Sequence, residues 1–298
     1  MSKVITNRKE IDFSLIDLPA MPLPTNVLMV RPGHFSVDYV INPHMAENVG
    51  KVDKAKAMQE WEAVKDAFAS TGLRVHTIDD QPGLPDMVFC ANQSLPFKNT
   101  HGDREVVMSI MHSKHRKPEV PYIEEWYRSQ GYTVHHPGYK VIRDFEGMGD
   151  AIWHPGRQLL WGGYGFRSSV EAYEFVSEKF AVPVIVLKLT SDKFYHLDTC
   201  FCMLNEDTVL IWPGAFSRKS LEMIRHLIPN VLEADAVEAE ERFACNATCP
   251  DGKHVLIQKG CVKTNQMLRD AGFTIIELET DEFIKSGGSV FCMKMLTW

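Results

Sequence analysis

Thr199-Cys200-Phe201-Cys202-Met203-Leu204 is an apolar run that ends in the turn-forming residues Asn205-Glu206-Asp207 and continues as Thr208-Val209-Leu210-Ile211-Trp212. Two short apolar runs on either side of a polar turn predict a pair of strands. Ser217 then supplies a favourable helix N-cap, and apolar residues follow at helical spacing: Leu221, Ile224, Leu227 and Ile228. Pro229-Asn230 ends this helix before a strand-like segment at 231–233. The predicted unit is therefore strand, turn, strand, helix, strand.

The same order of elements recurs along the chain, which indicates an internal repeat. Further copies are expected at 151–187, at 243–278 and, beginning at Met87, at 87–135. The remaining copy is split, because its helix (57–68) and strand (74–78) follow only one strand (27–30). We expect the missing strand at 290–295, paired with the first, because such pairing closes a ring and removes an exposed sheet edge. The sequence thus predicts an α/β fold, a five-bladed α/β propeller of five ββαβ-like units. It forms one domain at 27–298, with 1–26 as an N-terminal extension.

Composition limits the function. With 298 residues and 45% hydrophobic content the chain can bury a large core. The net charge is −7 and there is no basic block, so the sequence offers no surface for nucleic acid. No apolar run approaches the roughly 18 residues that span a bilayer, and charged residues interrupt the first twenty positions. We expect a cytoplasmic protein that acts on a small-molecule substrate and has no membrane partner. The sequence is also compatible with a homo-oligomer.

The cysteines support the same compartment. Their number, seven, is odd, and most lie in apolar strand-like runs, which is typical of reduced and buried thiols rather than a disulfide framework. Asn246-Ala247-Thr248 is then interpreted as a chance glycosylation sequon. Cys245 and Cys249, with His254 nearby, form only one Cys-x3-Cys pair, which is poor evidence for a metal site. No metal and no cofactor are expected.

Corresponding positions of a ring point at the same axis, and four units carry polar or nucleophilic groups there. These residues are Glu146, Asp150, His196, Asp198, Asn92 and Cys292. The first four precede the first strand of their units, Asn92 is expected after a first strand, and Cys292 is expected in the closing strand. A lone cysteine in a strand is usually structural, and a lone histidine is usually a satisfied core or surface residue. Agreement among the units instead predicts that Cys292, His196 and Glu146 are catalytic.

Four motifs together resemble those of the guanidine-modifying superfamily. They are Phe145-Glu146-Gly147-Met148-Gly149-Asp150, His196-Leu197-Asp198-Thr199, Gly163-Tyr164-Gly165-Phe166-Arg167-Ser168-Ser169 and Gly287-Gly288-Ser289-Val290-Phe291-Cys292. The superfamily includes arginine deiminases, dimethylarginine dimethylaminohydrolases and amidinotransferases, and its fold is a five-fold α/β propeller. Within it, Asp38-Tyr39-Val40-Ile41-Asn42-Pro43 and Asp86-Met87-Val88-Phe89-Cys90-Ala91-Asn92 are most similar to the arginine dihydrolase domain of cyanobacterial ornithine-forming enzymes. This resemblance implies the hydrolase half of those enzymes.

The chemistry expected of these residues is nucleophilic catalysis. A guanidinium resists water, and attack by a Cys292 thiolate divides its hydrolysis into two easier steps through a covalent adduct. Asp198 and Glu146 would hold the cation, with Glu146 also orienting His196, which would act as acid and then as base. The resemblance implies that Asp86 binds the substrate α-amino group and Arg167 its α-carboxylate. Arg116 loosely resembles a second carboxylate-binding arginine, with a solvated loop charge as the alternative.

Asn92 stands where deiminases have an aspartate. A carboxylate would repel the ureido oxygen of citrulline, whereas an amide can also donate to it and retain citrulline for a second attack. Asn92 together with Asn42 therefore favours conversion of arginine to ornithine, ammonia and carbon dioxide. The alternatives are arginine deiminase, dimethylarginine dimethylaminohydrolase, amidinotransferase and an inactive arginine-binding protein. Retention of Cys292, His196 and Glu146 argues against the last of these.

Overall fold

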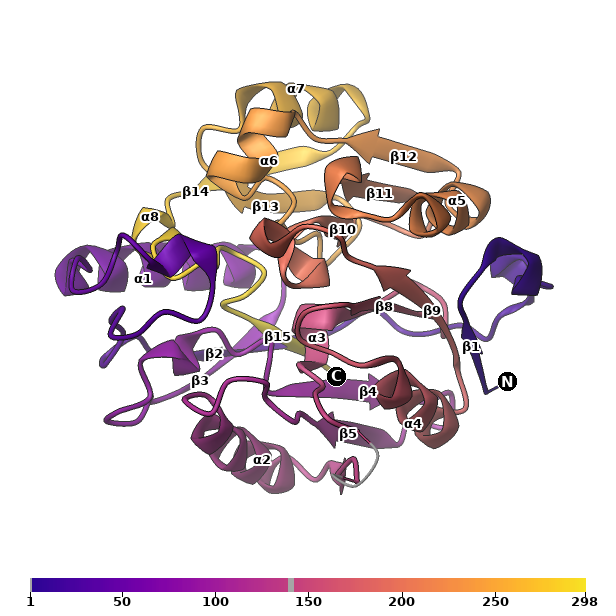
Figure 1. Ribbon diagram of the computed structural model, residues 1–298, viewed down its shortest axis with the longest axis horizontal. Helices are drawn as coiled ribbons and strands as arrows, with labels where there is room; N and C mark the ends of the chain where they lie inside the picture. The colour runs from indigo at the N-terminus through magenta and orange to yellow at the C-terminus, as the bar shows by residue number, and fades with distance from the viewer. Residues whose placement is uncertain (1, 139–141) are drawn as a thin grey trace.

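The strands form five separate sheets in the part of the chain that the structure, a computed structural model, describes, residues 2–138 and 142–298. Figure 1 shows the sheets arranged around a central region that contains the short helix α3 (Gly147–Asp150). The longer helices lie towards the outside. They are α1 (Lys54–Ser70), α2 (Val120–Ser129), α4 (Val170–Phe180), α5 (Arg218–Leu227) and α7 (Val262–Asp270). Loops at the inner ends of the sheets can therefore meet in the middle.

The sheet at 201–233 has the predicted order of elements. Its strands are β10 (Phe201–Met203), β11 (Thr208–Ile211) and β12 (Asn230–Glu233). β10 is antiparallel to β11, and β11 is parallel to β12 across helix α5. The Ser217 side chain accepts a hydrogen bond from the Ser220 amide, which caps α5, and Ile224 lies on the helix face that is buried. The expectation for this unit is confirmed.

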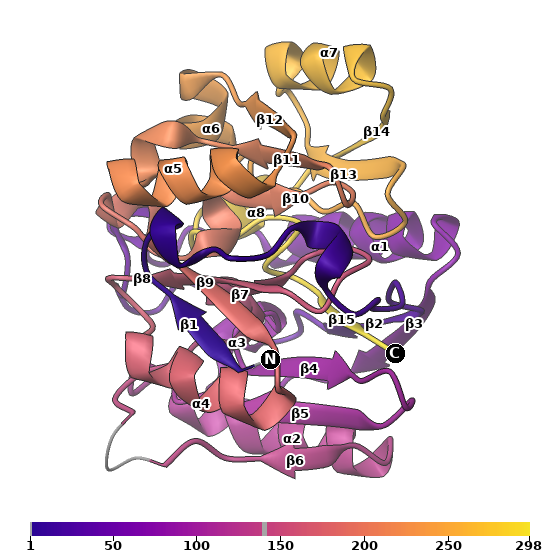
Figure 2. The same cartoon turned by 90° about the vertical axis from the view of Figure 1, so that its right-hand side faces the viewer.

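Three other sheets repeat this arrangement of one antiparallel and one parallel pair. Their strands are β7 (Ala151–Trp153), β8 (Leu160–Tyr164) and β9 (Pro183–Lys188); β4 (Ser94–Lys98), β5 (Arg104–Met108) and β6 (Thr133–His135); and β15 (Met295–Thr297), β2 (Asn26–Val30) and β3 (Arg74–Ile78). A further strand, β1 (Lys3–Ile5), runs parallel to β9 and widens the first of these sheets, as Figure 2 shows. The N-terminal segment is thus integrated into a sheet.

Three strand predictions are wrong. The segment 243–248 is not a strand, and only Thr248 forms a bridge, to Leu256; the last sheet is reduced to β13 (His254–Gln258) and β14 (Thr274–Leu278). The second unit begins its strand at Ser94, because Pro85–Val88 form a 3₁₀ turn, so Asn92 precedes the strand. The strand that pairs with β2 is β15, and Cys292 lies in the turn before it. In each case the backbone leaves the sheet where a side chain is directed into the centre.

The remaining elements are short. They are the helices α6 (Ala236–Arg242) and α8 (Asp281–Ile284), and the 3₁₀ turns Arg8–Glu10, Leu15–Asp17, Pro43–Met45, Lys117–Glu119, Asp192–Phe194, Leu197–Thr199 and Pro213–Ala215. Two clusters of buried apolar side chains form the core, a large one with Trp161 and Phe201 and a smaller one with Trp61 and Phe68. Across 2–138 and 142–298, no helix combines the length and apolar character required to cross a membrane.

Candidate active site

A small cavity collects most of the predicted site residues. It is lined by Asn42, Asp86, Asn92, Arg116, Arg167, His196 and Cys292, together with Ile41, Phe89, Tyr195, Ser286, Gly287 and Gly288. Its open space, mouth included, is about 310 Å³. Glu146 and Asp198 do not line the cavity, but each contacts a residue that does, as described next. The fold therefore brings all nine predicted side chains to one place.

His196 and Glu146 form a buried hydrogen-bonded pair. His196 precedes the 3₁₀ turn at Leu197–Thr199, and its Nε2 lies 2.6 Å from Glu146 Oε2. The other Glu146 oxygen accepts from the His112 amide, and Arg167 Nη1 lies 3.5 Å from Oε2. Burial alone would raise the pKa of Glu146, but the His196 hydrogen bond and the Arg167 charge outweigh it and hold this pKa at about 2. Glu146 is thus ionised and orients the imidazole, leaving Nδ1 on the side of Asn92.

Cys292 is held in the turn after Gly287-Gly288 by two side chains. Its Sγ lies 3.2 Å from Asp198 Oδ2 and 3.2 Å from Asn246 Nδ2. Burial and the negative charge of Asp198 raise the pKa of the Cys292 thiol well above its ordinary value. Cys292 is therefore a thiol that donates to Asp198. A bound cation reverses this balance, because it favours both the thiolate and the carboxylate.

Asp198 is the carboxylate beside that sulfur, and it is fully buried. Burial raises the pKa of Asp198 to about 7, while the Cys292 hydrogen bond and the charge of Lys294 oppose the increase. Its Oδ1 has no hydrogen-bond partner among the described residues. A buried carboxylate oxygen without a partner is costly, so this atom is suited to bind a donor from a ligand.

Asn92 is fixed in one orientation by Arg116. Arg116 Nη1 donates to Asn92 Oδ1 at 2.8 Å, and its other nitrogens donate to Glu119 and to the carbonyls of Asp86 and Phe89. The Asn92 oxygen is thereby occupied, and the amide Nδ2 is directed towards His196 Nδ1, 3.5 Å away. The Arg116 side chain is buried, so the alternative of a solvated loop charge is wrong.

The cavity is also lined by side chains of opposite charge, Asp86 and Arg167. Asp86 accepts from Tyr39 Oη at 2.7 Å and from Ser286 Oγ at 2.9 Å. Arg167 donates to the Ile41 carbonyl and lies over the Tyr195 ring. Asn42 donates to the Ser286 carbonyl and accepts from the His44 amide, so its contacts are with the surrounding loops. A carboxylate and a guanidinium in one cavity are suited to the two charges of an amino acid.

Two residues of this centre, Asn246 and Tyr39, are absent from the predicted site, and a third, Asp150, is expected at the axis but has no predicted role. Asn246 is fully buried, holds Cys292 through both amide atoms and donates to the Asp198 carbonyl; interpreting it only as part of a chance sequon missed this. Asp150 accepts from the Leu197 amide and from Ser168 Oγ, which fixes the turn that carries His196. Burial raises the pKa of Asp150 to about 6. Tyr39 donates to Asp86. For Asn246 the sequence offers one signal, because the alternation typical of a strand breaks down at this residue.

The seven cysteines all fall in the described residues, where each is buried and none forms a disulfide. Within 2–138 and 142–298, no three His, Cys, Asp or Glu side chains are grouped as metal ligands. Burial raises the pKa of Cys245 and Cys249 far above the ordinary thiol value, which makes both poor nucleophiles and poor metal ligands.

Comparison with known sequences identifies relatives over most of the chain. The family model described as N,N dimethylarginine dimethylhydrolase, eukaryotic, matches residues 32–297. The bifunctional arginine dihydrolase/ornithine cyclodeaminase AgrE of Nostoc sp. is 36% identical over 275 residues, which cover 90% of this chain and 37% of AgrE. The N(G),N(G)-dimethylarginine dimethylaminohydrolase of Mycobacterium tuberculosis is 31% identical, with 91% of this chain and 85% of that protein covered. The chain thus spans little more than a third of the bifunctional relatives.

Solved structures of similar proteins have the same fold as this chain. The substrate-bound N-terminal domain of ArgZ, an arginine dihydrolase from the ornithine-ammonia cycle in cyanobacteria, superposes with a TM-score of 0.85 at 33% identity, covering 91% of this chain and 97% of that domain. A dimethylarginine dimethylaminohydrolase adduct with S-methyl-L-thiocitrulline gives a TM-score of 0.77 at 20% identity, covering 92% of this chain and all of that one, and supports the fold alone. Fold and sequence together define the class of protein, the guanidine-modifying proteins. The chain belongs to the N,N-dimethylarginine dimethylhydrolase family, within the pentein superfamily of guanidine-modifying proteins.

Proposed function

We propose that this chain hydrolyses arginine to ornithine, carbon dioxide and two molecules of ammonia through a covalent Cys292 adduct. The catalytic unit is residues 27–298, a five-bladed α/β propeller closed by β15 and β2. The observation that carries the proposal is the orientation of Asn92, whose oxygen is occupied by Arg116 at 2.8 Å. The amide therefore offers N–H groups to the reacting end of the cavity, and N–H groups stabilise a ureido oxygen.

In the first half of the reaction, the guanidinium lies against Asp198, whose free Oδ1 accepts from it. The cation displaces the thiol proton from the Cys292–Asp198 hydrogen bond and favours the thiolate. Cys292 Sγ attacks the guanidinium carbon, and ammonia leaves with a proton supplied by His196. Water activated by the same imidazole then hydrolyses the thioether adduct to citrulline.

The second half repeats the chemistry on citrulline. Asn92 Nδ2 donates to the ureido oxygen, which retains the neutral intermediate and stabilises negative charge as Cys292 attacks again. A second ammonia leaves, water hydrolyses the resulting thiocarbamate of Cys292, and the carbamate that is released loses carbon dioxide to give ornithine. Two waters are consumed for each arginine. No step requires a metal or a cofactor.

The relatives support the substrate class. AgrE and ArgZ are bifunctional arginine dihydrolase/ornithine cyclodeaminases, and an ArgZ domain has been crystallised with its substrate and with a covalent reaction intermediate. Asp86 and Arg167, which also line the cavity, are proposed to bind the α-amino and α-carboxylate groups.

Product analysis tests the proposal. Purified enzyme given arginine alone should form ornithine and release about two ammonia per arginine, with little free citrulline. Asn92→Asp should still open the guanidinium, because a carboxylate binds a cation, but should stop at citrulline, where it faces an oxygen. The measurement is mass spectrometry of the products with enzymatic ammonia quantification. One ammonia and stoichiometric citrulline from the wild type would instead establish an arginine deiminase.

The family match favours a second candidate, hydrolysis of N(G),N(G)-dimethylarginine. This substrate would release dimethylamine and citrulline. Parallel assays with arginine and dimethylarginine decide between the two by their kcat/KM values.

A further inference from the structure

A second cavity lies behind the catalytic cysteine. Cys292 lines the active-site cavity, whereas its chain neighbours Phe291 and Lys294 line the second one, and the two cavities share no lining residue. The second cavity is bounded by the N-terminal segment at 21–24, by β7 and the turn after it, by residues 248–250 and by the C-terminal residues up to Trp298. Its space, mouth included, is about 600 Å³.

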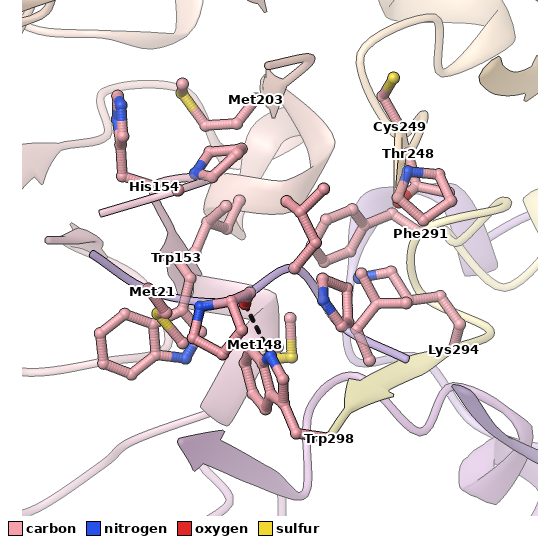
Figure 3. A pocket seen from close by; sticks show the side chains of 18 residues that line it. Met21, Met148, Trp153, His154, Met203, Thr248, Cys249, Phe291, Lys294 and Trp298 are labelled. Atoms are coloured by element: carbon pink, nitrogen blue, oxygen red, sulfur yellow. Dashed lines mark hydrogen bonds between the residues drawn. The ribbon is translucent and has the colours of Figure 1, made fainter. Parts of the chain in front are cut away.

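The walls of this cavity are largely apolar. Figure 3 shows Met21, Met148, Trp153, Met203, Phe291 and Trp298 around it. The indole N–H groups are already used, since Trp298 Nε1 donates to the Pro22 carbonyl and Trp153 Nε1 to the Pro96 carbonyl, both at 2.8 Å. These walls therefore provide apolar and aromatic contacts to a ligand and few hydrogen bonds.

Two wall residues, His154 at Nε2 and Lys294 at Nζ, carry a buried nitrogen without a hydrogen-bond partner among the described residues. Burial lowers the pKa of His154 to about 4, so Lys294 is the one of the two that can carry a positive charge near neutral pH. Its side chain is fully buried and runs beside Phe291, with Nζ 3.1 Å from the centre of that ring (Figure 3). Nζ has no hydrogen-bond partner within the described residues. An ammonium has three donors, and a ring face replaces only part of the water that burial removes. Burial accordingly lowers the pKa of Lys294 to about 7, against the opposing influences of Asp198, Cys202, Cys90 and Cys292.

We propose that this cavity is a second ligand site, which binds a small and largely apolar molecule carrying one carboxylate, with the carboxylate at Lys294 Nζ. An apolar body is required by the walls. An acceptor group is required by the amine, because a charge-assisted hydrogen bond compensates its burial. A carboxylate fits better than a phosphate, because a dianion needs several donors and the cavity offers one amine. The methionines allow the walls to adapt to the ligand shape.

The site also touches the catalytic centre. Lys294 follows Cys292 by two residues, and its charge lowers the pKa of Asp198. A carboxylate that holds Lys294 in the charged form therefore favours ionised Asp198. Ligand binding itself needs no catalysis, so its test is independent of the proposed function.

The test uses two probes of equal length, 3-phenylpropionate and 3-phenyl-1-propanol. Their binding to the wild-type chain is measured by calorimetry and by the fluorescence of the tryptophans that line the cavity. The carboxylate should bind one to one and about tenfold more tightly than the alcohol, as expected for a hydrogen bond to a charged group. In Lys294→Met this preference should disappear while alcohol binding remains. The matched control, Lys219→Met, changes an exposed lysine outside the cavity and should keep the preference.

Three results would overturn the proposal. They are the absence of saturable binding, an unchanged preference in Lys294→Met, and loss of carboxylate binding in Arg167→Ala, which would locate the probe in the active-site cavity. Circular dichroism establishes whether Lys294→Met folds. If it does not, binding of both probes to the wild type is measured between pH 6 and pH 9. The affinity for the carboxylate should fall over this range as the amine loses its proton, while the affinity for the alcohol stays constant. Equal carboxylate affinity at both ends of this range would contradict a site built on Lys294.

Discussion

Asp198 contacts the Cys292 thiol and, under the proposed function, also binds the substrate cation. It accepts from the Cys292 thiol with one oxygen and leaves the other without a partner in the described part of the chain. The protein thus places a carboxylate in a fully buried position, where the ionised form is unfavourable until a cation arrives. Under the proposed function, this arrangement favours a guanidinium over neutral molecules of similar shape.

The pH dependence of catalysis should report this carboxylate. Burial raises the pKa of Asp198 to about 7, so the group is neutral below that pH and charged above it. Guanidinium binding requires the charge, and kcat/KM for arginine should therefore fall about tenfold per pH unit below pH 7. The measurement is kcat/KM between pH 5.5 and pH 8. Asp198→Asn should lose most activity together with this slope, and a wild-type profile that is flat over the range would exclude Asp198 as the cation ligand.

The short helix α3 shows why glycine is required next to the catalytic side chains. A Cβ on Gly149 would lie 2.1 Å from Asn92 Nδ2 and 3.6 Å from His196 Cγ. Asn92 can reach its position beside the imidazole only because this residue has no side chain. Gly147 has a φ of 46°, and a Cβ there would overlap the Ser94 carbonyl.

Gly149→Ala should therefore act on catalysis more than on folding. The added methyl group displaces the Asn92 amide, and we expect the rate of ornithine formation to fall by about tenfold or more, with citrulline appearing as a product. The matched control is Gly138→Ala, where a Cβ meets nothing within 4 Å. Product ratios from both variants check the prediction. Unchanged product and rate in Gly149→Ala would show that Asn92 does not act at the reacting end.

The sequence predicts strands and helices correctly wherever their apolar residues keep the spacing typical of the element. The elements β10, β11 and α5 agree with the apolar pattern, because nothing but packing and the Ser217 cap determines them. The prediction failed at 243–248 and before Cys292, where apolar residues suggest a strand but the backbone turns so that Asn246 can hold the sulfur. Such contacts join residues 46 positions apart, and local pattern carries no information about them.

The contacts between the two ends of the chain concern the whole molecule. β15 pairs with β2, and the last residue, Trp298, is buried, donates from Nε1 to the Pro22 carbonyl and hydrogen-bonds through its backbone to Tyr132. The C-terminal residues thus hold the N-terminal segment and two sheets together. The turn that carries Cys292 directly precedes this strand, so the same contacts fix the nucleophile.

Trp298→Ala should consequently destabilise the whole fold. Loss of a buried indole and its hydrogen bond is expected to lower the free energy of unfolding by about 3 kcal/mol. Val262→Ala, at a position that is 70% exposed, is the control and should change it by less than about 0.5 kcal/mol. Urea denaturation followed by circular dichroism measures both. A loss below about 1 kcal/mol in Trp298→Ala would mean that the C-terminal contacts are dispensable for stability.

The central claim is that Cys292 forms a covalent bond to the guanidino carbon of the substrate. Enzyme mixed with arginine labelled with ¹³C at that carbon, quenched with acid during turnover and digested, can be analysed by peptide mass spectrometry. The account predicts the labelled carbon on the peptide that contains Cys292 and its absence in Cys292→Ser. Label on Cys249 or Cys261, or turnover that persists in Cys292→Ser, would contradict it.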